Sequence, residues 1–132
     1  MKVLVCAIAL FLLVTIFVTI NSIVLSNLFS DINDKLSLLP KTKESLDVLS
    51  DDERNEAIQN LDYISKKWKK YESYIFVTLE HNVSGEFYDQ FLPAKEYFKA
   101  GDFPSYLACL SSAKDILWQI KTNESLSFGT IF

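Results

Sequence analysis

The side chains that could do chemistry in this sequence are few and scattered. His81 is the only histidine, and the chain has no His-x-x-x-His or Cys-x-x-Cys spacing. A general base needs an oriented partner, and a zinc site normally needs three or four ligands at recognisable spacing. We therefore expect neither catalysis nor metal binding at His81. We predict that the protein is not an enzyme and holds no cofactor.

An acidic run is the next candidate, and it consists of Asp51, Asp52, Glu53 and Glu56. The run lacks the alternating oxygen ligands and the central glycine of a calcium loop. With Ser50 in front it forms a capping box, in which Ser50 bonds the third helical amide and Glu53 bonds back. The pattern predicts the start of a helix and not a cation site.

Four lysines surround a tryptophan: Lys66, Lys67, Lys69 and Lys70 flank Trp68. Such a cluster could hold anionic lipid head groups or wall polymers at a membrane face. The interpretation that we favour places Trp68 on the core side of a helix, with the lysines as its solvated flanks. The four lysines stay candidates for contact with lipid or a partner.

Two pairs of residues could suggest a disulfide bond or glycosylation, and we expect neither. Cys6 lies in the apolar N-terminal stretch and Cys109 in the later domain, so a membrane would keep them too far apart for a disulfide. Asn82 and Asn123 begin N-glycosylation sequons, which matter only in a eukaryotic secretory pathway. None of these residues predicts a site.

Composition points to long helices and away from nucleic acid. The 132 residues include only three Gly and three Pro, fewer than a loop-rich sandwich or barrel needs. The net charge is -4, and Lys2 is the only charged residue before Asp31, so the later part of the chain is more acidic still. Since nucleic-acid binding draws on Lys and Arg at phosphates, we predict no nucleic-acid partner.

The first thirty residues of the chain have the composition of a membrane anchor. Between Val3 and Ile20 only Thr15 and Thr19 interrupt the apolar sequence. At about 1.5 Å per residue this stretch is about 27 Å long, close to the hydrocarbon thickness of a bilayer. A cleavable signal peptide is the alternative, but a small residue stands only at position -1 of the candidate site, at Ser22. We therefore predict an uncleaved transmembrane helix.

Charge sets the expected orientation of this anchor. Lys2 and the amino terminus precede it, and Asp31 and Asp34 follow it at the start of an acidic domain. The positive-inside rule then places the N-terminus in the cytoplasm and the C-terminal domain outside the cell. We expect a single-pass protein of the cell membrane with the bilayer as one of its partners.

Beyond the anchor, apolar residues recur at helical spacing. A helix continues from residue 31, with Pro40 expected to kink or end it, and a second runs from Ser50 to about Glu80. A third is expected after a turn at 81–85, and a fourth ends near Asn123. The expected core positions are Ile32, Leu36, Leu39, Leu46, Leu49, Ala57, Leu61, Ile64, Trp68, Tyr71, Ile75, Phe87, Phe91, Ala94, Phe98, Tyr106, Leu110, Ala113, Leu117 and Ile120.

The joint between the last two helices carries the sharpest local signal. Gly101 suits the left-handed position after a helix, Asp102 or Phe103 suits the next cap, and Pro104 suits the first turn. The joint resembles that of tetratricopeptide-type repeats, but no second copy follows at a fixed period. We predict an all-α fold: a transmembrane helix followed by an antiparallel three- to four-helix bundle.

The chain ends in a short apolar segment that includes Phe128, Ile131 and Phe132 and carries no charge. Such a segment is unusual at a solvent-exposed terminus, so we expect a lipid or a partner to cover it. The predicted division of the chain is an anchor at 1–30, an extracytoplasmic helical bundle at 31–125 and an apolar C-terminal tail at 126–132.

Several segments together resemble a known family: the anchor, Leu39-Pro40-Lys41, the Trp68 helix, the turn at 97–102 and the C-terminal residues 127–132. The chain is similar over nearly its whole length to an uncharacterised domain-of-unknown-function family. That family comprises small membrane-anchored helical proteins from Gram-positive spore-forming bacteria. The resemblance implies an extracytoplasmic helical domain with no assigned activity or catalytic residues.

Two hypotheses about function remain open. In the first, the protein is an interaction module, an accessory to another membrane protein of unknown identity. In the second, it is a sensor whose apolar pocket binds a lipid or small amphiphile between helices, lined by Phe87, Phe91, Tyr97 or Trp118.

Overall fold

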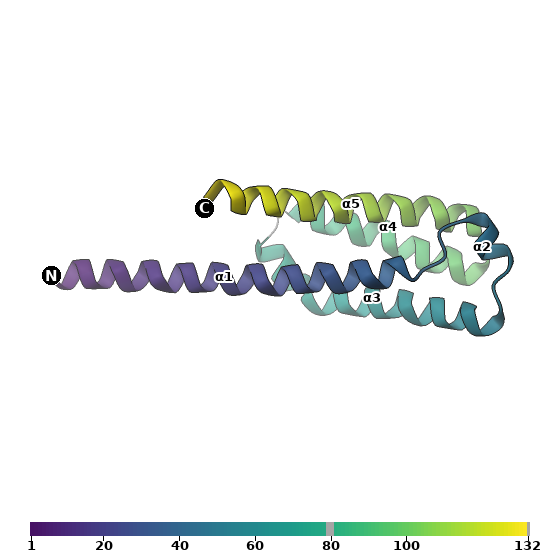
Figure 1. The fold of residues 1–132 in the computed structure, drawn as a ribbon, viewed down its shortest axis with the longest axis horizontal. Coiled ribbons are helices and arrows are strands. Elements are labelled where there is room, and N and C mark those ends of the chain that lie inside the picture. Colours follow the sequence, from purple (N-terminus) through teal and green to yellow (C-terminus); the bar gives the residue numbers. More distant parts are fainter. Residues whose placement is uncertain (79–80, 132) are drawn as a thin grey trace.

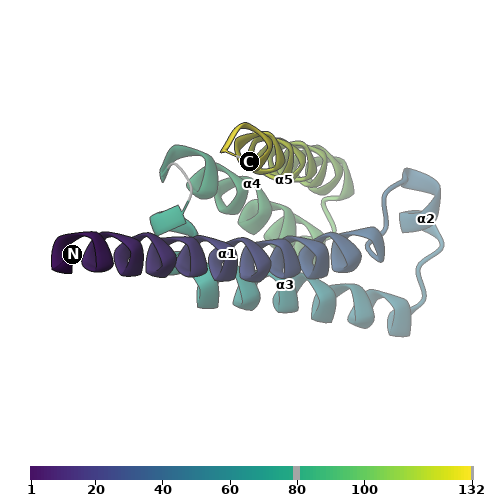
Figure 2. The ribbon, with the colours of Figure 1, turned by 60° about the vertical axis from the view of Figure 1, so that its left-hand side comes forward.

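The protein is all-helical, as predicted. A computed structural model describes the backbone of residues 1–78 and 81–131 and the side chains of residues 1–75 and 85–122. The helices are α1 (Lys2–Ser37), α2 (Lys43–Asp47), α3 (Asp51–Thr78), α4 (His81–Ala100) and α5 (Phe103–Ile131). Four long helices pack as an antiparallel bundle, with α1 and α3 beside α4 and α5 (Figures 1 and 2).

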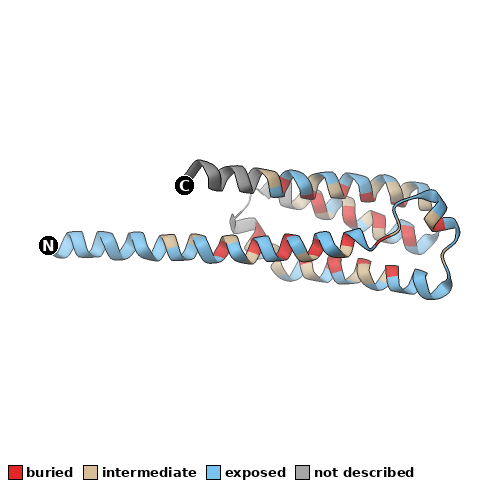
Figure 3. Ribbon diagram, in the orientation of Figure 1, coloured by how far each residue is buried: buried red, intermediate tan, exposed pale blue. Residues whose placement is uncertain are grey.

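Helix α1 has two halves in different surroundings, although it runs without a break from Lys2 to Ser37. The first half projects from the bundle and exposes its apolar side chains; Phe11, for example, is 71% exposed. Burial begins at Asn21 and continues at Leu25, Leu28, Phe29, Ile32 and Leu36 (Figure 3). The predicted division at residue 30 therefore falls inside a helix, and core residues lie on both sides of it.

The chain reverses direction around Pro40. The predicted stop is confirmed, because α1 ends at Ser37 and Pro40 lies in the connection to the short helix α2. The hydroxyl of Tyr106 donates a hydrogen bond of 2.9 Å to the Pro40 carbonyl oxygen. Tyr106 is fully buried, and that burial raises the pKa of its hydroxyl. This bond fixes the reversal against α5.

The start of α3 is the predicted capping box. The Ser50 amide donates to the Glu53 carboxylate at 2.9 Å, and the Glu53 amide donates to the Ser50 hydroxyl at 3.2 Å. These bonds satisfy two amides that the helix itself cannot pair, so they define where α3 begins.

The joint between α4 and α5 is also as predicted. Gly101 has a φ of +80°, the left-handed conformation that glycine adopts without strain. Its amide bonds the Phe98 carbonyl at 3.1 Å, and the Asp102 amide bonds the Tyr97 carbonyl at 2.9 Å, a Schellman pair. The Asp102 carboxylate then accepts a bond from the Ser105 amide at 3.3 Å and caps α5.

Two helix boundaries differ from the prediction. Helix α4 begins at His81, although we expected a turn at 81–85 before it. Helix α5 continues to Ile131, although we expected an end near Asn123. Residues such as Asn, Ser and Gly weaken a helix by at most about 1 kcal/mol each, which tertiary contacts can offset. Reasoning from helix propensity alone therefore made both predicted helices too short.

The core is built from the predicted stripes, and aromatic rings fill its centre. All of the predicted core positions are buried except Tyr71 and Leu49, which are partly buried against the core. The ring centre of Trp68 lies 4.3 Å from that of Phe87 and 6.4 Å from that of Phe29. Phe87 stacks on Phe91 with 5.6 Å between the ring centres. Rings from α1, α3 and α4 thus form one continuous cluster.

A charge at the centre of this core should unfold the protein. We expect Ile64→Asp to lower the free energy of unfolding by more than about 3 kcal/mol, because Ile64 is fully buried and its replacement would be an unpaired carboxylate. Lys66→Glu, on the exposed side of the same helix, should change it by less than about 0.5 kcal/mol. Thermal melts of the full-length protein in detergent would check both, and similar melting temperatures for the two variants would contradict the assignment.

A second prediction concerns where the folded unit begins. A chain of residues 21–132 should be more stable than one of residues 31–132 by at least about 5 kcal/mol. The shorter chain loses the side chains of Leu25, Leu28 and Phe29, each worth about 1.5–3 kcal/mol when buried. Urea titrations followed by circular dichroism would measure the difference, and equal midpoints would place the boundary at residue 30 after all.

Candidate interaction surfaces

A polar cluster fastens α3 to the second half of α1. The Lys67 ammonium lies 2.9 Å from the Asp31 carboxylate, and the Tyr63 hydroxyl donates to the same carboxylate at 2.6 Å. The hydrogen bond from Tyr63, followed by that from Lys67, holds the pKa of Asp31 below its usual range. The hydrogen bond to Asp31 in turn raises the pKa of Lys67. The Lys67 side chain therefore forms part of the contact between α3 and α1.

A second polar contact lies at the edge of the apolar half of α1. The Tyr74 hydroxyl donates a hydrogen bond to the side-chain oxygen of Asn21. Asn21 is the first polar, uncharged amide after the apolar stretch, and it is only 9% exposed. Because an unpaired buried amide would be costly, this bond fixes the level at which α3 meets α1.

The other lysines of the predicted cluster do not converge on one site. Lys66 is exposed, and the Lys69 ammonium lies 3.4 Å from the Glu72 carboxylate and 5.7 Å from the centre of the Tyr88 ring. Lys70 lies over the Tyr71 ring at 5.7 Å. Trp68 itself is buried in the core. The lysines thus flank a core tryptophan on the outside of α3, the arrangement that we favoured.

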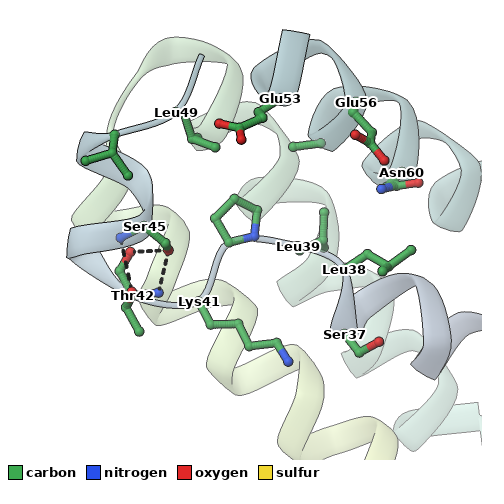
Figure 4. A pocket seen from close by; sticks show the side chains of 13 residues that line it. Ser37, Leu38, Leu39, Lys41, Thr42, Ser45, Leu49, Glu53, Glu56 and Asn60 are labelled. Atoms are coloured by element: carbon green, nitrogen blue, oxygen red, sulfur yellow. Dashed lines mark hydrogen bonds between the residues drawn. The ribbon is translucent and has the colours of Figure 1, made fainter. Parts of the chain in front are cut away.

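The largest hollow that we describe is an open groove at the reversal around Pro40, with a volume of about 560 Å³. Figure 4 shows its lining, which joins the end of α1 and the α2 segment to the first turns of α3. It mixes the acids Glu53 and Glu56 with the apolar side chains of Leu38 and Val48, which are 63% and 79% exposed. It lies at the end of the bundle farthest from the apolar half of α1 (Figure 1).

A second surface surrounds Trp118, which is 67% exposed. It lines a shallow groove of about 140 Å³ between α1 and α5, together with Phe29, Asn33, Leu36, Lys114, Leu117 and Lys121. Desolvation, followed by repulsion from Lys41, lowers the pKa of Lys114. Among the described side chains, no carboxylate forms an ion pair with Lys114. We name Trp118, Lys114 and Lys121 the Trp118 face.

The four aromatic residues considered for a sensor pocket do not surround a common space. Phe87 and Phe91 are fully buried and stack on each other in the core. Tyr97 is 39% exposed, and Trp118 lies on the outer surface of α5. A ligand between these residues would have to displace core rings.

The remaining sequence candidates are the possible metal ligands, the C-terminal apolar residues and the two cysteines. Among the residues that the structure describes, no group of three or more His, Cys, Asp or Glu is placed to hold a metal ion. His81 and the C-terminal residues Phe128, Ile131 and Phe132 lie outside the described side chains. The two cysteines are free thiols, with Cys6 exposed on the apolar half of α1.

Sequence reasoning missed the Asp31–Lys67 pair and the Trp118 face. Nothing in the sequence links two charges on different helices. For Trp118 a signal was present: it falls next to Leu117, outside the stripe that leads to Ile120. A large aromatic residue off the core stripe of an amphipathic helix indicates an exposed ring.

Comparison with known proteins places the chain in a family. A family model described as a domain of unknown function, DUF4363, matches residues 23–131, and the chain belongs to this family. Neither a curated protein nor a solved structure matches the chain. The match begins close to Leu25, where burial of α1 in the core begins. Among the residues that the structure describes, one helix, α1, is long and apolar enough to cross a membrane.

The Asp31–Lys67 pair predicts a pH-dependent contribution to stability. Because the pKa of Asp31 is lower in the folded protein than in the unfolded chain, its contribution is present at neutral pH and is lost as pH falls through the folded pKa. We expect Asp31→Asn to lower the free energy of unfolding by about 0.5–1 kcal/mol at pH 7, the size typical of a partly exposed pair.

Urea titrations at pH 7 and near pH 3 would measure this effect, with Asp34→Asn as the control. Asp34 is exposed, and its variant removes the same charge from the next turn of α1. An equal loss in both variants, or a loss for Asp31→Asn that persists at low pH, would contradict the assignment.

Proposed function

We propose that this member of the DUF4363 family is a membrane-anchored helical interaction module, an accessory to another membrane protein that docks on the Trp118 face. The observation that carries the proposal is the exposed Trp118 ring between Lys114 and Lys121, beside a helix apolar enough to cross a membrane. Tryptophan is among the residues most often found at the energetic centres of protein interfaces.

The first half of α1 is the anchor in this proposal. Its exposed apolar side chains have no cover within the described structure, as expected for a helix surrounded by lipid. Lys2 before it and the acidic domain after it favour a cytoplasmic N-terminus and a bundle outside the cell. The extracytoplasmic location and the single crossing are part of the proposal.

The continuity of α1 gives the bundle a fixed position relative to the membrane. Because the same helix forms the anchor and a wall of the core, no flexible linker separates the two. The groove beside Trp118 includes Phe29 and Leu36, which lie about 14–24 Å beyond Ile20 along the helix. A partner that spans the same membrane would meet the Trp118 face at a constant height.

The charge of the Trp118 face predicts which surface such a partner would present to it. Lys114 is partly desolvated and without an ion pair among the described residues, and Lys41 repels it. An acidic group from outside would relieve this repulsion, while an apolar pocket would cover the Trp118 ring. The partner surface that fits best is thus an apolar hollow edged by Asp or Glu.

Three further expectations stay predictions. We predict that the protein has no enzymatic activity and that its family is restricted to Gram-positive spore-formers. The sensor hypothesis would need a pocket other than one lined by Phe87 and Phe91, since both are packed in the core. The groove around Pro40 is the described hollow large enough for a small ligand.

Site-specific photo-crosslinking tests the docking face. A photoreactive phenylalanine analogue at position 118 of the full-length protein, in its native membrane, should form a crosslink to one membrane protein. The same analogue at exposed Glu96 on α4 should not. Lys114→Glu combined with Lys121→Glu should reduce the crosslink at least about tenfold, because two attractive charges become repulsive.

The crosslinking result requires that the variants fold like the original protein. Trp118→Ala and the double lysine variant should melt within about 2 °C of the original protein, since these positions contribute little to the core. Equal crosslinks from positions 118 and 96, or a crosslink that survives both charge reversals, would show that the Trp118 face does not dock a partner.

A further inference from the structure

Helix α3 ends beside the apolar half of α1. It runs antiparallel to α1 (Figure 1). Tyr74 bonds Asn21, the residue that follows the apolar stretch. The helix then continues for one more turn, to Thr78. Its last turn therefore lies level with residues of α1 such as Ile20, which is 53% exposed.

Helix α5 reaches the same level. The groove that contains Phe29 of α1 also contains Lys121 of α5, and this sets the register of the two antiparallel helices. From Lys121 the α5 backbone continues to Ile131, about 15 Å at a rise of 1.5 Å per residue. The same length measured back from Phe29 leads to about Thr19, inside the apolar half of α1.

Both helix ends lack charge. No charged residue occurs at 73–78 or at 125–131. We name these two segments the base of the bundle. Two uncharged helix ends level with a lipid-facing half of α1 match the surroundings of a membrane interface and not those of water.

Directly above the base lies a zone of the polar and aromatic residues that favour lipid head groups. Tyr71 stands at this level, just above Tyr74 at the upper end of the base, and membrane proteins concentrate tyrosine at such an interface. Lys69 and Lys70 precede Tyr74 by about one turn, or about 6–8 Å. This offset matches the depth of a head-group layer, about 5–8 Å on each side of the hydrocarbon.

These lysines are available to a lipid. The Lys69 side chain is 65% exposed, and its ion pair with Glu72, at 3.4 Å within the same helix, is an exposed pair of little strength with which a lipid phosphate can compete. Lys70 is exposed beside the Tyr71 ring. Lys67, by contrast, is held by Asp31 and contributes to the fold. The chain as a whole is acidic, so two exposed lysines at this level are a local feature.

We propose that the base of the bundle is seated in the outer interface of the membrane, where Lys69 and Lys70 bind the phosphates of anionic phospholipids. The uncharged ends of α3 and α5 then lie among the upper acyl chains beside α1. The seating is shallow, because α3 ends about 6 Å beyond Tyr74 and the sequence next brings Glu80 and His81. The inference rests on the anchoring role of α1 and not on the protein partner.

Spin labels measure the depth of the base. Full-length protein with Cys6→Ala and Cys109→Ala would carry one label at position 10, 111 or 128 and would be reconstituted in nanodiscs. The label at 128 should be relaxed more by oxygen than by a water-soluble nickel complex, like the label at 10 in the anchor. The label at Ser111, exposed higher on the same helix as position 128, should show the reverse.

Lipid retention tests the lysines. Nanodiscs would contain equal amounts of phosphatidylglycerol and phosphatidylcholine, and native mass spectrometry would count the lipids that stay bound to the released protein. At about fivefold per lysine, Lys69→Gln with Lys70→Gln should lower the ratio of bound phosphatidylglycerol to phosphatidylcholine about 25-fold. Lys41→Gln with Lys43→Gln removes the same charge at the far end of the bundle and should leave the ratio unchanged.

The outcomes separate this inference from the docking proposal. A water-accessible label at 128 with a lipid-buried label at 10 would overturn the seating and leave the anchor and the Trp118 face intact. Equal lipid ratios for the two double variants would overturn the assignment of Lys69 and Lys70. A water-accessible label at 10 would overturn the anchoring on which both proposals rest. Crosslinking at position 118 reports on the protein partner alone.

Discussion

The rest of the structure depends on the continuity of α1. One helix supplies an exposed apolar half and, without a break, a wall of the core that includes Leu25, Phe29 and Ile32. The bundle is therefore joined rigidly to the first half of the same helix. The family match, which starts at residue 23, includes this wall of the core.

Polar contacts between helices set the register of this arrangement. Asn21 with Tyr74, and Asp31 with Lys67, hold α3 at one position along α1. On the other side of α3, the Asp62 carboxylate lies 2.7 Å from the Lys95 ammonium of α4. The two ion pairs are each worth little in stability, but a one-turn slip would break all three contacts and misplace the aromatic core rings. Register in turn decides which residues share a level with the apolar half of α1.

That register divides the exposed cations into two groups with different surroundings. Lys69 and Lys70 lie about one turn above the contact between Tyr74 and Asn21, whereas the Trp118 face lies beside Phe29 to Leu36, about 14–24 Å beyond Ile20 along α1. A ring as exposed as Trp118 at that height is too far from the apolar half to enter lipid. The two surfaces thus suit different partners, a lipid layer and a protein.

The sequence by itself determined the four long helices and their buried faces, the cap of α3 and the joint between α4 and α5, since the 3.6-residue period and capping motifs are local properties. It misplaced the start of α4 and the end of α5. It did not determine that α1 joins the core before residue 30, that Lys67 belongs to Asp31, or that Trp118 stays outside. Those facts depend on which helices are neighbours and at what level they meet. Only tertiary packing decides both, because one periodic stripe can face several partners with similar burial of apolar surface.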